Sequence, residues 1–277
     1  MIIDAHIHIM PGPVEQTRLL KEMALAGMDG GCLISELPSD RTTPQERLAN
    51  LIAWTRGAEN LHPLFWIDPV AESALDQVDQ AVEAGVVGFK VICSSHAPGD
   101  PQAIPVYRAI AERDKPILFH SGILWDGRPS SDYNRPAAFE ALLEVPNLRF
   151  SLAHMSWPWV DECVAVYGKF LNATLFRPDA PEMYVDMTPG TPEIYRQEAL
   201  TKFFTVGYAV ADNMIFGSDS VTTAYNSAWA RSWRERDAAI MDSLGLGPDI
   251  ADRVFGGTIQ RWLSGAKKER SLPRMGE

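Results

Sequence analysis

The chain has 277 residues, of which 46% are hydrophobic and 22% are charged, a composition typical of a globular protein that excludes a disordered or collagen-like chain. It carries 36 Asp and Glu against 25 Lys and Arg, a formal net charge of −11. An acidic surface repels the phosphates of nucleic acids and anionic lipids, so we expect a small-molecule substrate and neither a nucleic-acid nor a membrane partner.

The cysteines and the amino terminus indicate the compartment. Cys32, Cys93 and Cys163 are odd in number, widely spaced and without a CxxC pair, which argues against a disulfide framework and a thiolate zinc site. The first residues lack the basic and apolar regions of a secretory signal, and no run approaches the roughly 18 apolar residues of a membrane-spanning helix. These features predict a cytoplasmic protein.

Short apolar runs alternate with segments of helical periodicity along the chain. The runs predict strands at 2–8, 31–35, 63–67, 86–92, 116–120, 148–153, 183–187 and 214–217. Helices are predicted at 14–26, 44–58, 73–84, 104–113, 136–143, 159–170, 192–210, 225–244 and 258–263. Thr followed by Pro44 or Pro192 is typical of an N-cap with proline at the first helical position.

The alternation of eight strands with helices predicts a single-domain (β/α)8 TIM barrel over 1–277, with a polar tail from about 264. The runs are apolar on both faces, as buried parallel strands are. A doubly wound open sheet is the alternative, but it commonly has fewer strands and a phosphate-binding glycine loop after the first one. Here the first strand ends in histidines instead.

Polar residues at the ends of the predicted strands are informative, because barrel enzymes carry their chemistry there. With a strand period of two, His6 and His8 face the same side, and paired neutral imidazoles are good zinc ligands. His120 and His154 end the fifth and sixth strands, and Asp219 follows the eighth. Each residue alone has a structural alternative, a core histidine or an N-cap aspartate, but the set favours a metal centre.

Four motifs in this order resemble the amidohydrolase superfamily. They are DAHIH at 4–8, FHSG at 119–122, LAHM at 152–155 and FGSDS at 216–220. The resemblance is to the amidohydrolase-related branch, which includes aminocarboxymuconate-semialdehyde decarboxylase-like and resorcylate-type decarboxylases beside many hydrolases. RPAAFE at 135–140 and PNL at 146–148 also match that branch, whereas GGT at 256–258 departs from its frequent Gly-Asn-Ala turn.

The resemblance implies one divalent metal ion, most often Zn²⁺, with Mn²⁺ as the alternative. It implies metal ligation by His6, His8, His120 and Asp219. His154 corresponds to a histidine that stays off the metal and activates water or substrate. An imidazole titrates near neutrality, so His154 suits acid–base catalysis, and Asp219 can take a proton from the activated water or hold that water in place.

Lys90 ends the fourth predicted strand, in the sequence GFKV. In two-metal branches of the superfamily a carboxylated lysine on this strand bridges the ions. The other interpretation, which we favour, is an inward lysine that pairs with a carboxylate or binds substrate. Asp186, near the end of the seventh strand, can orient a ligand histidine, and Asp4 is expected to pack in the barrel floor.

Loop residues near the strand ends are candidates for substrate binding. Trp125 and Trp157 offer aromatic walls, and Arg128 or Arg177 can bind a substrate carboxylate through two hydrogen bonds. Solvated loop charges are the structural alternative for both arginines.

The function predicted is a metal-dependent hydrolase that uses metal-activated water on a small carbonyl compound, such as an amide, a lactone or a C–C bond substrate. The alternative is a non-oxidative decarboxylase of an aromatic or unsaturated acid, which would use the same metal site. A homodimer is common in the family.

Overall fold

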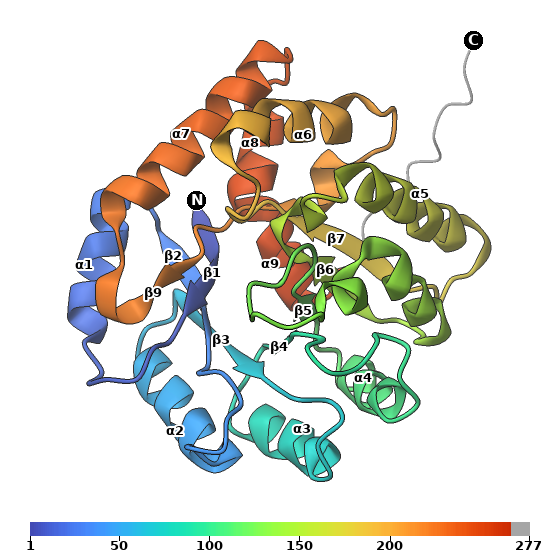
Figure 1. Cartoon of the computed structure of the whole chain (residues 1–277). Helices are drawn as coiled ribbons and strands as arrows, with labels where there is room; N and C mark the ends of the chain where they lie inside the picture. Colours follow the sequence, from blue (N-terminus) through green and yellow to red (C-terminus); the bar gives the residue numbers. More distant parts are fainter. Residues whose placement is uncertain (267–277) are drawn as a thin grey trace.

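The computed structural model describes residues 1–266. Parallel strands form a central ring that helices surround on the outside (Figure 1). Sequential neighbours pair from β1 to β8. The strands are β1 (Ile3–His8), β2 (Gly30–Ile34), β3 (Leu61–Trp66), β4 (Gly88–Val91), β5 (Ile117–Phe119), β6 (Arg149–Leu152), β7 (Glu182–Asp186), β8 (Met214–Ile215) and β9 (Ser220–Val221).

The eighth barrel strand is divided into two short pieces. β8 pairs with β7, and β9 pairs with β1. Between these pieces, Ala5 N donates a hydrogen bond to Phe216 O over 3.0 Å, which joins β1 to the end of β8. The ring therefore closes as a (β/α)8 barrel, which confirms the predicted fold and rules out the open doubly wound sheet.

The helices lie near their predicted positions, except α8 (Pro248–Asp252), which the sequence did not predict. They are α1 (Gln16–Ala26), α2 (Pro44–Thr55), α3 (Ala74–Glu83), α4 (Ala103–Glu112), α5 (Val160–Phe176), α6 (Glu193–Thr205), α7 (Ser227–Ser243), α8 (Pro248–Asp252) and α9 (Thr258–Ser264). The helix predicted at 136–143 is a 3-10 helix, Pro136–Glu144. The helix predicted at 192–210 is shorter and ends at Thr205.

The two proline start signals have different outcomes. Thr43 forms a capping box with Glu46 before Pro44, as the sequence predicts. The prediction for Pro192 is wrong, because Pro192 is itself the N-cap of α6. The hydroxyl of the preceding Thr191 instead donates to His154 O over 3.3 Å, so this residue joins the β7–α6 turn to the β6 end.

Two apolar layers stabilise the barrel. Between strands and helices, residues such as Ile7 pack against Leu19 and Met23 of α1. Inside the barrel, residues from several strands pack together with Ile259 and Trp262 of α9. Because Arg149 Nε, at the start of β6, donates to Trp262 O over 3.0 Å, α9 lies at the end of the barrel where the strands begin. The opposite end of the barrel, where the strands end, is therefore not covered by α9.

The tail predicted from about 264 lies almost entirely outside the described residues. Among residues 1–266, no helix is both long enough and apolar enough to span a lipid bilayer.

Candidate metal centre

The carboxyl ends of the strands surround a cavity of about 650 Å³. Apolar side chains, including Trp66 and Ile92, form part of its wall, and charged and imidazole groups form the rest. Most of the site residues predicted from the sequence line it, namely His6, His8, Lys90, His120, Trp125, Arg128, His154, Trp157 and Asp219.

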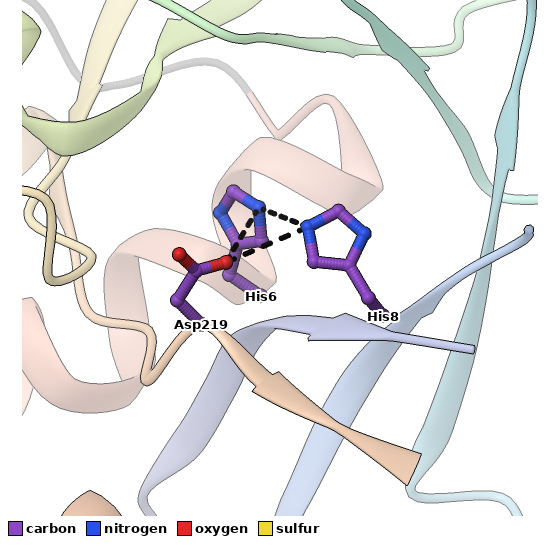
Figure 2. Close-up of side chains that lie close together, drawn as sticks. All are labelled: His6, His8 and Asp219. Carbon is purple, nitrogen blue, oxygen red and sulfur yellow. Dashed lines mark hydrogen bonds and ion pairs between the residues drawn. The ribbon is translucent and has the colours of Figure 1, made fainter. Parts of the chain in front are cut away.

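Two histidines and one carboxylate converge in this cavity (Figure 2). His6 Nε2 lies 3.1 Å from His8 Nε2, and Asp219 Oδ1 lies 3.7 Å from the first nitrogen and 3.5 Å from the second. Ligand atoms bound at about 2.0–2.1 Å to one tetrahedral zinc ion are about 3.3 Å apart. The three atoms therefore fit a single ion, and the described residues contain no other group of His, Cys, Asp or Glu ligand atoms this close.

A bulge in β1 aims its histidines into the cavity. Between the pairs Asp4–Gly31 and Ile7–Leu33, β1 uses one more residue than β2. An extra residue of this kind re-aims the side chains that follow it, and such bulges are common beside active sites. Here it directs His6, and with it the second histidine of the strand, toward the carboxyl end of the barrel.

The second ring nitrogen of His6, Nδ1, contacts a buried carboxylate. His6 Nδ1 lies 2.7 Å from Asp186 Oδ2, and both side chains are buried. Asp186 is fixed in turn by the backbone N–H of Thr188, at 2.7 Å, and by the Thr188 hydroxyl. A carboxylate that accepts the Nδ1 proton selects the tautomer in which Nε2 is free for a metal ion. Asp186 thus has the orienting geometry that its sequence position suggests.

We expect Asp186→Asn to weaken metal binding by about 10- to 100-fold, because the amide loses the negative charge that makes His6 a stronger ligand. Competition with a chromophoric chelator measures this affinity directly. An affinity equal to that of the wild type would show that Asp186 only packs against His6.

Burial and neighbouring charges set the protonation of the three ligand candidates. Burial, together with the charge of Lys90, lowers the pKa of His6 below its ordinary value, and burial likewise lowers the pKa of His8. Burial alone would raise the pKa of Asp219, but the neighbouring His8 and His6 lower it well below its ordinary value. Neutral imidazoles and an ionised carboxylate are the forms that bind a divalent cation.

His120 lies beside this group without joining it. Its ring centroid is 5.0 Å from that of His154, and its Nε2 lies 3.1 Å from Ile123 O. Burial, and next to it the charge of His154, lowers the pKa of His120 well below its ordinary value, so this imidazole is neutral as well. Its role as a fourth ligand stays a prediction.

His154 occupies an unusual backbone conformation next to the group. Its φ is 61°, and Met155 and Ser156 also have positive φ values. Non-glycine residues pay a conformational cost there, and such conformations cluster at functional sites. Within residues 1–266 neither ring nitrogen is hydrogen-bonded, and Nδ1 is buried. Burial lowers the pKa of His154 to about 4, below the neutral range expected from the sequence.

Lys90 is almost fully buried and faces the cavity. Burial lowers its pKa to about 8, against the opposing effect of Asp186 and Asp219. The carboxylate partner that the sequence suggested is not found, since Lys90 forms no ion pair in the part of the chain that the structure describes. Its ammonium group is therefore available to a bound molecule.

The loop candidates divide into two groups. Trp125, Trp157 and Arg128 line the cavity, and Trp125 is 81% exposed at its mouth. Arg177 does not line the cavity, so its predicted place at the mouth is wrong. Its guanidinium group donates to Leu143 O at 3.1 Å and lies 3.6 Å from Asp179 Oδ1. The physical reason is chain direction, because Arg177 precedes β7 and so lies at the end of the barrel where the strands begin.

Several cavity residues were missed by the sequence reasoning. Asp68 lines the cavity and lies two residues after the end of β3, so the strand-end rule would have found it. Two glycines allow close packing that no sequence pattern reveals. A Cβ on Gly190 would lie 2.7 Å from His154 Cγ, and a Cβ on Gly217 would lie 2.8 Å from His6 Cβ.

A family model described as Amidohydrolase matches residues 3–264. No match is found among the curated proteins. Among solved structures, 2,6-dihydroxybenzoate decarboxylase from Rhizobium is 16% identical, with a TM-score of 0.63 over 95% of this chain and 98% of that one. An amidohydrolase from Burkholderia multivorans is 13% identical, with a TM-score of 0.63 over 95% and 99%. Dihydroorotase from Campylobacter jejuni is 14% identical, with a TM-score of 0.61 over 97% and 84%.

Proposed function

The chain belongs to the amidohydrolase family, and we propose that it is a metal-dependent hydrolase of a small carbonyl compound. The observation that carries this proposal is the convergence of His6 Nε2, His8 Nε2 and Asp219 Oδ1 on one point of the cavity, with His154 close by. Two nitrogen ligands and one carboxylate suit Zn²⁺, with Mn²⁺ as the alternative.

A divalent ion at this site would supply Lewis acidity, which polarises a carbonyl and lowers the pKa of a water molecule. The protein's own residues would then move the protons. Gly190 packs closely against the Nδ1 side of the His154 ring, so we assign proton transfer to Nε2. The ring is neutral above a pH of about 4. The ionised Asp219 would hold the attacking water or accept its proton.

The cations of the cavity that have no partner favour an anionic substrate. Three carboxylates line the cavity, and each has a partner: Asp68 accepts from Val70 N, Asp126 from Ser130 and Arg128 N, and Asp219 contacts the histidines. The side chains of Lys90 and Arg128 have no such partner among the described residues. A substrate carboxylate would therefore be attracted to these two cations, while Trp125 and Trp157 would contact its apolar part.

We expect Arg128→Ala to lower kcat/KM by about 10- to 100-fold on an acidic substrate, because a charge-assisted hydrogen bond is lost. Arg177→Ala is the matched control, since Arg177 lies at the opposite end of the barrel, and its kinetics should stay within twofold of the wild type. Steady-state kinetics of both variants measure the difference. Equal kinetics for Arg128→Ala and the wild type would show that Arg128 is a solvated loop charge that does not bind the substrate.

Non-oxidative decarboxylation is the second candidate reaction. The observation that favours it is the fold similarity to 2,6-dihydroxybenzoate decarboxylase, also found for the complex of that enzyme with 2,6-dihydroxybenzoate at a TM-score of 0.65. Lys90 and Arg128 would bind the acid at the same site, and the neutral His154 would accept a proton from water and transfer it to the carbon that loses CO₂.

Product analysis separates the two reactions. The metal-replete and metal-free protein are assayed in ¹⁸O-labelled water against lactones, amides and carboxylic acids. Hydrolysis incorporates one ¹⁸O atom into the product and needs the metal, and this is the expected result. Release of CO₂ from an acid without ¹⁸O incorporation into the organic product would replace hydrolysis by decarboxylation.

We further propose a cytoplasmic location, small molecules as the substrates and a homodimer as the assembly. The buried, unpaired state of Cys32, Cys93 and Cys163 suits a reducing compartment.

A further inference from the structure

Asp4 is a fully buried carboxylate below the metal centre that receives several hydrogen bonds. Its Oδ1 accepts from His6 N at 3.3 Å and from Ser218 N at 2.8 Å. Its Oδ2 accepts from the hydroxyl of Ser218 at 2.5 Å and from that of Tyr225 at 2.9 Å. One side chain thus joins the bulge of β1, which supplies the two histidines, to the residue directly before Asp219.

Asp219 itself has a backbone conformation that must be held in place. It lies in the break between β8 and β9 with φ of 57°, the left-handed region that disfavours residues with a Cβ. A conformation of this kind is strained and persists only where the surroundings over-determine it. The strand ladder cannot supply that constraint, because the ladder is interrupted at this point.

Ser218 transmits the constraint, since each of its polar atoms is engaged. Its N–H and hydroxyl contact Asp4, its carbonyl accepts from Trp229 Nε1 at 2.9 Å, and its Oγ lies 2.7 Å from Ser220 Oγ. Ser218 is therefore fixed on one side of Asp219, and Ser220 on the other side pairs with Ile7 of β1.

We propose that Asp4 is a positioning residue that holds the carboxylate of Asp219 against His6 and His8 by binding Ser218. This inference rests on the proposed metal site. Asp4 touches neither the three converging ligand atoms nor the cavity, so it acts through the backbone of residues 217–219 and of the β1 bulge. Loss of this link would allow Asp219 to leave the left-handed region and would separate the carboxylate from the imidazoles.

Two hydroxyl groups that bind the same oxygen of Asp4 provide the test. Ser218→Ala removes the hydroxyl bond to Oδ2 on the side that leads to Asp219. Tyr225→Phe removes the other bond to Oδ2, and with it a contact of the Tyr225 hydroxyl with the Ser218 side chain, but it keeps both bonds between Ser218 and Asp4. Ser220→Ala is a second control, because it removes the Ser218–Ser220 contact and keeps Ser218 bound to Asp4. Zinc affinity is measured for each variant by chelator competition, together with the unfolding midpoint.

We expect Ser218→Ala to weaken zinc binding by about tenfold or more, the range found when residues that support metal ligands are changed. Tyr225→Phe and Ser220→Ala should bind zinc within about twofold of the wild type, even where the unfolding midpoint falls. Asp4→Asn should show the largest loss if it folds.

The contrary outcomes are distinct. Equal zinc affinities for Ser218→Ala and Tyr225→Phe would overturn the positioning role and leave Asp4 as a stabilising core residue. A wild-type protein that binds no zinc or manganese would instead contradict the proposed metal site.

Discussion

His154→Asn is expected to lower kcat by a factor of about 10²–10⁴ while the variant keeps its fold and its metal ion, because a general acid–base group contributes an acceleration of this size. Asparagine keeps the polarity and approximate volume of the side chain but cannot accept a proton. The ring lies beside the metal candidates, 5.5 Å from the ring of His6, yet outside the group whose ligand atoms converge. Steady-state kinetics and elemental analysis of the same preparation check both parts.

The pH dependence of this variant follows from the burial of His154. Burial lowers the pKa of the ring to about 4, so the imidazole is the base form at neutral pH and becomes protonated only as the pH falls through that value. The wild-type rate should therefore fall below a pH of about 4, and His154→Asn should lack this acidic limb. Loss of metal together with activity would make His154 a ligand, and activity within a few-fold of the wild type would exclude it from catalysis.

The second large effect is expected for the double replacement His6→Ala, His8→Ala. Removal of both imidazoles leaves Asp219 as the single member of the converging group, and one carboxylate does not retain a zinc ion against dilution and chelators. The purified variant should contain no stoichiometric metal and should show no metal-dependent activity.

His62→Ala is the matched control for that experiment, since His62 lies in β3 and is not among the described residues that line the cavity. It should keep its metal and its activity. A double variant that still carries one ion per chain would show that the ion is bound elsewhere, for example by His120 and His154.

The sequence allowed the barrel and the neighbourhood of the site to be predicted, because both depend on short-range patterns. Apolar runs set the strands, and the strand-end rule brought His6, His120 and Asp219 to one cavity. The period of two placed both histidines of β1 on one side, but the bulge between Asp4 and Ile7 that aims them depends on pairing with β2 and has no signal in β1 alone.

Features that depend on distant contacts could not be predicted. The break in the eighth strand is stabilised by Asp4, more than 200 residues away in sequence. The sequence placed Asp186 as an orienting residue, but its choice of His6, 180 residues away, depends on the closed barrel. Arg177 was misplaced for a different reason. The sequence assigned it to the mouth, although residues that precede a strand lie at the end of the barrel where the strands begin.

Elemental analysis of the purified protein tests the central claim most directly. Protein produced with zinc and manganese supplied should contain about one divalent ion per chain, as the single converging group of His6, His8 and Asp219 predicts. A protein without bound metal under these conditions would contradict the proposed metal-dependent hydrolase. Two ions per chain would contradict the single-ion site and would assign Lys90 the bridging role.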